Sequence, residues 1–213
     1  MLQIFLIVIL IMSAVVHECS HGLMAFWLGD PTAKNAGRLT LNPLVHLDWF
    51  GSVLLPLLFV LTGSSFMIAW AKPVPYNPYN LRDKKYGDLK VALAGPGSNL
   101  CLAMLFGLLG RVLISVTGQP GLDGSLPHAL ALLAVYACLL NLGLMIFNLM
   151  PVPPLDGSKI ILTFLSAKGK MLFYRFELYG MLIVVALVFF GAFDFIYPAI
   201  TTIGNFLLGG QYL

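Results

Sequence analysis

Residues 17–21 read HECSH, a polar motif inside an apolar segment that runs from residue 1 to residue 28. On a helix, His17 and His21 lie about one turn apart on the same face, so their imidazoles can bind one zinc ion. Glu18 lies beside them and could take a proton from a zinc-bound water. The plain alternative is two histidines and a stray glutamate in a helix. In a membrane span, however, charged side chains cost roughly 2 kcal/mol or more each, which favours a functional role.

Composition places the chain among polytopic membrane proteins. Its 213 residues are 59% hydrophobic and 10% charged, and its mean hydropathy is +0.92. These values predict an all-α polytopic membrane protein with about four to six transmembrane helices. Because no polar stretch is long enough for a separate soluble domain, we expect one membrane-embedded domain over residues 1–213. Its catalytic core should cover about residues 1–165 and its C-terminal helices about 171–213.

The apolar segments after the motif predict further spans. Residues 49–70 are apolar but broken by Gly51, Pro56 and residues 62–65, so they form either one span or a re-entrant hairpin. The short tail either spans, returns part-way or lies in the interface. The expected segments are a first span at about Leu2–Leu28, later spans at about Val91–Val116, His128–Met150 and Leu178–Phe193, and the tail at Ile196–Leu208.

Basic residues gather in two loops, at 72–90 and 158–175, although the net charge is only +3. Lys and Arg mark cytoplasmic loops, so this pattern indicates topology rather than a nucleic-acid partner. Both loops should therefore be cytoplasmic, and Asp156, next to the second loop, should lie near the cytoplasmic face. If Asp156 binds the same zinc ion as His17 and His21, the C-terminal half of the first span lies near that face too. This arrangement requires residues 49–70 to enter and leave the membrane on the same side, which favours the re-entrant hairpin over a full span.

Asp156 is the best candidate for a third zinc ligand, because a catalytic zinc site usually has three protein ligands and one water. It follows the prolines of residues 151–154, which must interrupt regular helix. Non-helical backbone at membrane depth is tolerated only against protein or a wet cavity. Gly157 beside it allows close backbone approach. The alternative is a surface turn. His46 is better explained as a loop histidine, and His128 as a residue of the opposite membrane face.

Residues 37–43 alternate polar and apolar side chains between Gly and Pro, a pattern typical of a short strand. We expect a membrane-associated β-hairpin here, either an ordinary interfacial hairpin or an edge strand that pairs with an extended substrate. A helical substrate must be unwound, because helix backbone hides its peptide bonds. The candidate substrate-binding residues are Arg38, Leu39, Thr40, Leu41 and, in a later span, Asn99. Packing between helices is the alternative role for Asn99.

Two motifs together carry a family resemblance. An HExxH motif in a membrane span, followed by N-x-x-P-x-x-x-x-D-G at residues 148–157, resembles the site-2 protease family of intramembrane zinc metalloproteases. Residues 95–99, Gly-Pro-Gly-Ser-Asn, also resemble a family feature. The resemblance covers about residues 10–160. No PDZ or CBS domain is evident, so the chain is similar to a minimal member, expected in the cell membrane of a prokaryote with its active site near the cytoplasmic face.

The resemblance implies hydrolysis of peptide bonds within or near the membrane, with one Zn²⁺ per chain. The expected zinc ligands are His17, His21 and Asp156, and Glu18 is the expected general base. Asn148 is expected to donate to the oxyanion, an inference that depends mainly on the family; alternatively, it caps the helix before Pro151.

The expected partners are transmembrane protein or peptide substrates and the lipid bilayer, while the oligomeric state is not predicted. One rival function is a membrane protein that binds or transports zinc, and another is an inactive scaffold. A zinc transporter would need several acidic or histidine side chains spaced along an ion pathway through the membrane. The chain has four histidines, two of them in one motif around a glutamate, and this arrangement suits hydrolysis better. An intact set of predicted site residues argues against the inactive scaffold.

Overall fold

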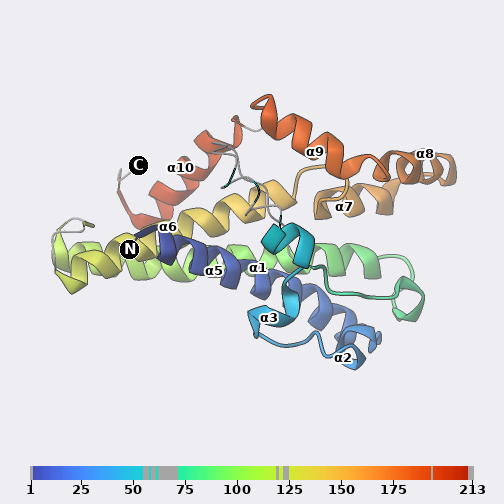
Figure 1. Ribbon diagram of the computed structural model, residues 1–213, viewed down its shortest axis with the longest axis horizontal. Coiled ribbons are helices and arrows are strands. Elements are labelled where there is room, and N and C mark those ends of the chain that lie inside the picture. The colour runs from blue at the N-terminus through green and yellow to red at the C-terminus, as the bar shows by residue number, and fades with distance from the viewer. Residues whose placement is uncertain are drawn as a thin grey trace.

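The computed structural model describes residues 2–54, 58, 61, 72–118, 120–121, 125–192 and 194–210, and its described part is mainly helical (Figure 1). Among the described residues, three helices are long and apolar enough to cross a membrane: α1 (Leu2–Trp27), α5 (Gly87–Thr117) and α6 (Leu126–Asn148). A fourth span exists if α8 (Ala167–Glu177) and α9 (Gly180–Phe189) are counted as one bent segment, with a bend of 63°. The prediction of a mainly helical membrane protein is confirmed, whereas the predicted minimum of four spans is reached among the described residues only if this bent pair counts as one span.

The remaining elements are short and lie in the connections or near the C-terminus. They are α2 (Thr32–Asn35), α3 (Pro43–His46), η1 (Trp49–Leu54), η2 (Pro78–Asn80), α7 (Asp156–Phe164) and α10 (Ile196–Leu208).

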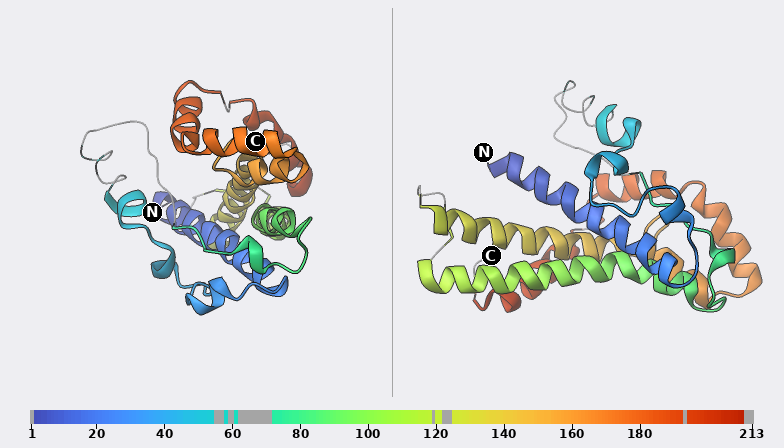
Figure 2. Two further views of the ribbon diagram at one scale, coloured as in Figure 1. Left: turned by 90° about the vertical axis from the view of Figure 1, so that its right-hand side faces the viewer. Right: turned by 90° about the horizontal axis from the view of Figure 1, so that it is seen from below.

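Helices α5 and α6 form an antiparallel pair along the long axis of the molecule, and α1 crosses both (Figure 2). The buried residues between α5 and α6 include Ala103, Cys138 and Leu142, and small residues there let the two backbones approach closely. The N-terminal half of α1 leaves this pair and exposes apolar side chains such as Ile4 and Ile7. In a membrane protein these side chains face lipid.

Helix α6 ends where the sequence stops supporting a helix. Asn148 is its last residue, and the proline-containing segment of residues 151–155 has no regular structure before α7 begins at Asp156. Each proline lacks a backbone N–H and cannot continue the helical hydrogen-bond pattern. The interruption therefore places Asp156 at the first turn of a new helix, directly beyond the end of a spanning one.

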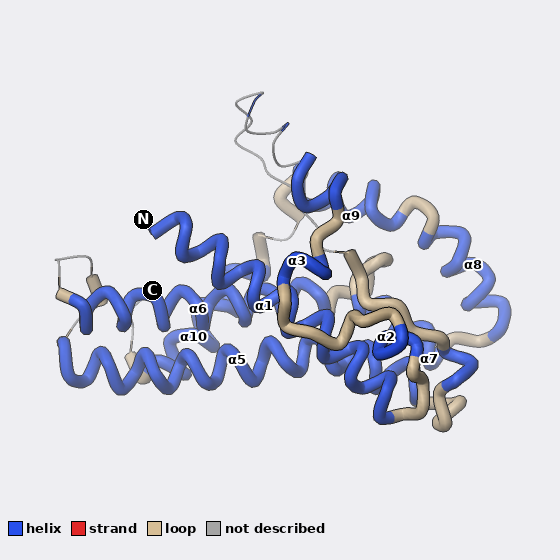
Figure 3. The backbone as a smooth tube through the Cα atoms, turned by 60° about the horizontal axis from the view of Figure 1, so that its bottom comes forward, coloured by secondary structure: helices blue, strands red, loops and turns tan. Residues whose placement is uncertain are grey.

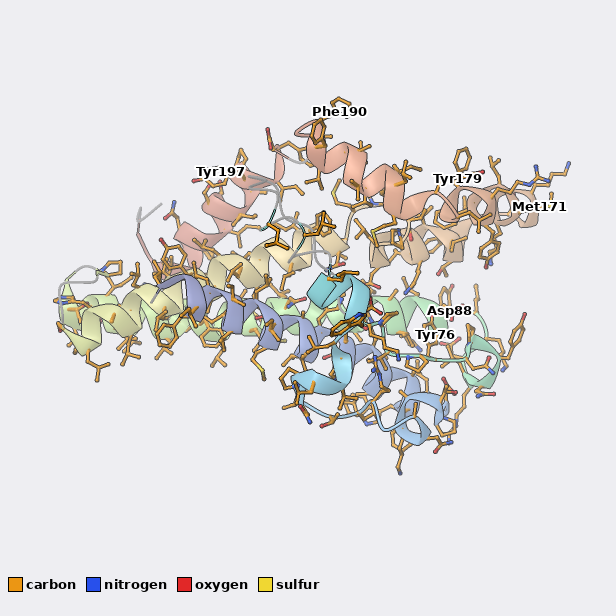
Figure 4. The ribbon with its side chains drawn as sticks, in the orientation of Figure 1. Tyr76, Asp88, Met171, Tyr179, Phe190 and Tyr197 are labelled. Atoms are coloured by element: carbon orange, nitrogen blue, oxygen red, sulfur yellow. The ribbon has the colours of Figure 1, made fainter. Side chains whose placement is uncertain are left out.

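Helices α8, α9 and α10 run back along one side of the α5–α6 pair. Their outer surface carries large exposed side chains, and Tyr179, Phe190 and Tyr197 point away from the helical core (Figure 4). Aromatic residues of this kind are enriched where a membrane protein meets the lipid headgroups.

The predicted β-hairpin is not confirmed. No strand occurs in the described part of the chain, where residues 37–42 form a loop beside α1 (Figure 3). The sequence alternation exists, but among the described residues this segment has no neighbouring strand with which to form a ladder. Most of the predicted re-entrant segment, residues 55–57, 59–60 and 62–70, lies outside the described residues.

Asp30 connects the two loops that flank the C-terminal end of α1. Its fully buried carboxylate accepts hydrogen bonds from the Asn77 N–H at 2.6 Å, the Asn80 side chain at 2.8 Å and the Thr32 hydroxyl at 2.5 Å. Burial alone would raise the pKa of Asp30, but the hydrogen bonds from Thr32, Asn80 and Asn77 outweigh it and hold the pKa below its usual value. The loop that leads into α5 is thereby fixed against α1.

Candidate metal centre

His17, His21 and Asp156 meet at one buried point between α1 and the start of α7. The Asp156 Oδ2 atom lies 3.1 Å from the Nε2 atom of each histidine, and the two Nε2 atoms are 3.0 Å apart. One donor atom from each residue lies within 4.8 Å of the others. Two imidazole nitrogens and one carboxylate oxygen are a donor set that suits zinc. We refer to these three residues as the metal centre.

Helix α5 forms the wall behind the two histidines. The Val91 carbonyl accepts a hydrogen bond from His21 Nδ1 at 2.7 Å, and Asn99 Oδ1 lies 2.5 Å from His17 Nδ1. Between them, a Cβ at Gly95 would overlap the imidazole rings of His21 and His17. Because a carbonyl only accepts, His21 must carry its proton on Nδ1, which leaves the Nε2 lone pair facing Asp156. The wall thus leaves space for the rings and orients them toward a cation.

Asp156 reaches the metal centre because the chain before it folds back tightly. A Cβ at Gly157 would overlap the backbone carbonyl groups of Leu149 and Met150, so only glycine fits there. The nearby Lys159 ammonium favours the ionised form of this carboxylate, so Asp156 is available as a ligand.

Lys159 contacts the other oxygen of the same carboxylate. Its Nζ atom lies 3.5 Å from Asp156 Oδ1, one turn along α7, and 5.9 Å from the centre of the Tyr76 ring. Tyr76 belongs to the segment that leads into α5 (Figure 4). This contact occupies Oδ1 and leaves Oδ2 directed at the histidines.

Glu18 lies next to the metal centre and is held by a backbone group. Its Oε2 atom accepts a hydrogen bond from the Val74 N–H at 2.9 Å. The buried Arg38 guanidinium fixes the segment before Val74, because it donates to the carbonyls of Lys72 at 2.8 Å and Pro73 at 3.3 Å, and also to Val45. Arg38 therefore connects the loop after α1 to the backbone that positions Glu18.

The other predicted substrate-binding residues of this loop lie along α1. Leu39, Thr40 and Leu41 line a hollow of about 280 Å³ together with residues 16, 19, 20 and 23 of α1. Leu39 is the inner member and would contact any Cβ placed at Gly22. Leu41 is 57% exposed and is the outer member. The hollow thus opens beside the helical turn that carries the metal centre.

Asn148 and the remaining candidates have ordinary local partners. The Asn148 side-chain N–H group donates to the Leu144 carbonyl at 3.0 Å within α6. His46 is buried at the end of α3 and pairs with the Thr40 carbonyl at 2.8 Å, and the Cys19 thiol donates to the same carbonyl at 2.9 Å. His128 begins α6 at the opposite end of the helix and lies 3.0 Å from the Thr117 carbonyl. None of these contacts involves the metal centre.

Sequence reasoning missed four contributors to the site: the Val91 carbonyl, the Val74 N–H, the space at Gly95 and the Lys159 ammonium. Two of them are backbone groups, which no residue pattern reveals. Gly95 lies in a stretch that the family resemblance had singled out, without a role for its missing side chain. Lys159 was visible as the basic residue one helical turn after Asp156, but it was counted only as a topology signal.

Comparisons with known proteins relate the chain to zinc peptidases. The family model described as "Peptidase family M50" matches residues 113–191, which include Asn148 and Asp156. "Putative zinc metalloprotease YwhC" of Bacillus subtilis is 36% identical over 183 residues, which cover 86% of this chain and 79% of that protein. "Putative zinc metalloprotease Rip2" of Mycolicibacterium smegmatis is 31% identical over 188 residues, or 87% of this chain and 67% of that protein. No solved structure matches the chain.

Proposed function

We propose that this chain, which belongs to peptidase family M50 and is a zinc metalloprotease, hydrolyses peptide bonds in transmembrane or membrane-proximal segments of other proteins. The observation that carries the proposal is the convergence of His17, His21 and Asp156 at a buried point on a spanning helix. A buried set of ionisable side chains at that position is costly and therefore functional by default.

The residues around the metal centre have separate chemical roles. A zinc ion bound there would act as a Lewis acid toward the scissile carbonyl and make a water molecule reactive at neutral pH. Glu18, held by the Val74 N–H, accepts the proton of the attacking water and later delivers it to the leaving amine. Asn148 turns its amide from Leu144 toward the oxyanion and stabilises it as a neutral donor.

The proposed enzyme lies in the cell membrane of a prokaryote with the metal centre near the cytoplasmic face. The basic segments 72–90 and 158–175 flank the end of the α5–α6 pair that carries the metal centre, whereas the last residue of α5, Thr117, and the first residue of α6, Leu126, lie at the other end (Figure 1). The positive-inside rule assigns the basic end to the cytoplasm. Protease accessibility of residues 72–90 in inside-out vesicles, compared with intact cells, tests this orientation.

The hollow beside α1 is the proposed approach for an extended substrate. Leu39 packs inward, whereas Leu41 is exposed at the rim, and its backbone N–H has no hydrogen-bond partner among the described residues. An unpaired N–H beside a hollow can bond an extended peptide, as the edge of a sheet does. Thr40 lies between these two leucines and faces the same hollow.

Leu41→Pro is expected to raise KM about tenfold for a peptide substrate and to leave the zinc content unchanged. Proline removes the N–H, and one lost hydrogen bond of about 1.4 kcal/mol corresponds to a factor of ten. Leu41→Ala is the matched control, because it shortens the side chain and retains the N–H. Steady-state kinetics on both variants separate the two contributions, and a wild-type KM for Leu41→Pro contradicts the backbone contact.

Removal of zinc is expected to abolish peptide hydrolysis, and one equivalent of zinc should restore it. The test uses the purified chain in lipid nanodiscs, a chelator, and a panel of single-span peptides whose products are identified by mass spectrometry. Cleavage that depends on zinc supports the proposal and locates the cut bond. Zinc binding without cleavage of any peptide supports the rival zinc-binding protein, and a chain that binds no zinc excludes both.

A further inference from the structure

A continuous row of buried hydrogen bonds runs from the metal centre across three spanning helices. His17 Nδ1 in α1 lies 2.5 Å from Asn99 Oδ1 in α5, and Asn99 Nδ2 lies 2.9 Å from Asn141 Oδ1 in α6. Asn141 Nδ2 in turn lies 2.9 Å from Ser13 Oγ, one helical turn before His17 on α1. Both asparagines are 0% exposed. The row therefore leads away from the metal centre and returns to the helix where it began.

The direction of every bond in this row follows from one carbonyl group. Asn141 Nδ2 also lies 2.9 Å from the Ala137 carbonyl, which can only accept, so the amide nitrogen of Asn141 must face that carbonyl. The Asn141 oxygen then faces Asn99 and requires a donor there. Asn99 therefore presents its nitrogen to Asn141 and its oxygen to His17, and the proton of His17 lies on Nδ1.

We propose that Asn99 and Asn141 are positioning residues that hold His17 in the tautomer with its proton on Nδ1, so that Nε2 offers a lone pair to zinc. The inference deepens the proposed function, because it concerns the ligand field of the same metal centre. The Val91 carbonyl imposes the same tautomer on His21. Both Nε2 atoms and Asp156 Oδ2 then face one another as acceptors at 3.0 and 3.1 Å. A cation bound between the three acceptors would stabilise this arrangement.

The position of the row inside the membrane explains why it uses neutral amides. An asparagine pair satisfies its polar groups internally without adding a charge to a buried site. Outer partners of metal-bound histidines fix ring orientation, and their removal costs roughly 10- to 100-fold in metal affinity. We expect the effect to be largest at Asn99, which contacts the ring, and smaller at Asn141, which only fixes the orientation of Asn99.

Asn99→Leu is expected to weaken zinc binding by roughly 10- to 100-fold, measured by competition with a chelator in lipid nanodiscs. The second readout is the ¹⁵N NMR spectrum of the zinc-free chain labelled at histidine, in which the chain's four histidines leave few signals to assign. Wild type should show His17 protonated at Nδ1, and Asn99→Leu should show a tautomer mixture. Cys138→Ala is the control, because Cys138 is equally buried on α6 but lies outside the row.

Asn141→Leu keeps the inference testable if Asn99→Leu does not fold. It leaves the contact between Asn99 and His17 in place but removes the group that orients the Asn99 amide, so we expect a tautomer mixture and a smaller loss of zinc affinity. Wild-type zinc affinity and an unchanged His17 tautomer in either folded variant overturn the inference. Both readouts are independent of proteolysis, so a chain that binds zinc with this dependence but cleaves no peptide refutes the proposed function alone.

Discussion

Glu18→Gln is expected to lower kcat for peptide hydrolysis by roughly 10²- to 10⁴-fold and to leave zinc binding unchanged. Glutamine has nearly the same shape, and its carbonyl oxygen can still accept the hydrogen bond from the Val74 N–H that holds Glu18. It cannot accept a proton from water at neutral pH. Because Glu18 is not among the three converging donors, the metal centre remains complete. Single-turnover kinetics on a single-span peptide, with zinc measured by mass spectrometry, provide both quantities.

The control for this substitution is Asp83→Asn. It also replaces a carboxylate by an amide, but in the segment that leads into α5 and outside the metal centre. Asp83 accepts a hydrogen bond from the Lys90 ammonium at 2.7 Å, and its side chain is partly exposed at that ion pair. The substitution should leave kcat within twofold, because an ion pair at the protein surface contributes little. A Glu18→Gln variant that retains activity within tenfold of wild type contradicts the general-base assignment, whatever its zinc content.

The spanning helices could be predicted from the sequence because the signal is long and continuous. The span predicted at Leu2–Leu28 corresponds to α1, and those predicted at Val91–Val116 and His128–Met150 correspond to α5 and α6. The span predicted at Leu178–Phe193 contains only the ten-residue helix α9, which counts as a span only if it is joined to α8 across a bend of 63°. Hydropathy over a window reports that a segment is apolar, but not where its axis changes direction. The observed ends of α5 and α6 also differ by a few residues from the predicted ends, because hydropathy averaged over a window does not locate the last helical residue.

The hairpin prediction shows where a local pattern is insufficient. The alternation in residues 37–43 satisfies the strand pattern, but a strand also needs a partner, and none is present among the described residues. Arg38 illustrates the difference: its position in the alternation made it a candidate for substrate contact, whereas its guanidinium is buried against the Lys72 and Pro73 carbonyls. Contacts between loops distant in sequence decide this region, and no single-sequence pattern encodes them.

The metal centre was more predictable than its surroundings. The pair of motifs indicated His17, His21 and Asp156, and the structure brings their donor atoms together. The family prediction is confirmed by the comparisons. Asn99 was identified as a polar residue in an apolar span, within a stretch that resembles a family feature, and the sequence left substrate contact and helix packing as alternative roles. Its contact with His17 depends on the rotation of α5 about its axis, which packing between whole helices determines.

Gly95→Ala is expected to remove most zinc affinity and, with it, nearly all peptide hydrolysis. A Cβ at this position would overlap the rings of both histidines, and they cannot retreat without breaking their contacts to Val91 and Asn99. Overpacking of this kind lowers the free energy of unfolding by about 1–3 kcal/mol when the surroundings can shift. Here the atoms that must shift are the metal donors themselves, so we expect the strain to appear as at least a 100-fold loss of zinc affinity.

Gly97→Ala is the matched control, since it adds the same methyl group to the same helix two residues later. A Cβ at Gly97 meets no heavy atom within 4 Å, and alanine in a helix interior is more favourable than glycine by roughly 0.5–1 kcal/mol. This variant should therefore bind zinc and cleave peptide as wild type does, with equal or slightly higher thermal stability. Stoichiometric zinc at wild-type affinity in Gly95→Ala would show that the histidines do not lie against α5. Zinc loss in both variants would instead attribute the effect to flexibility of the helix around Pro96.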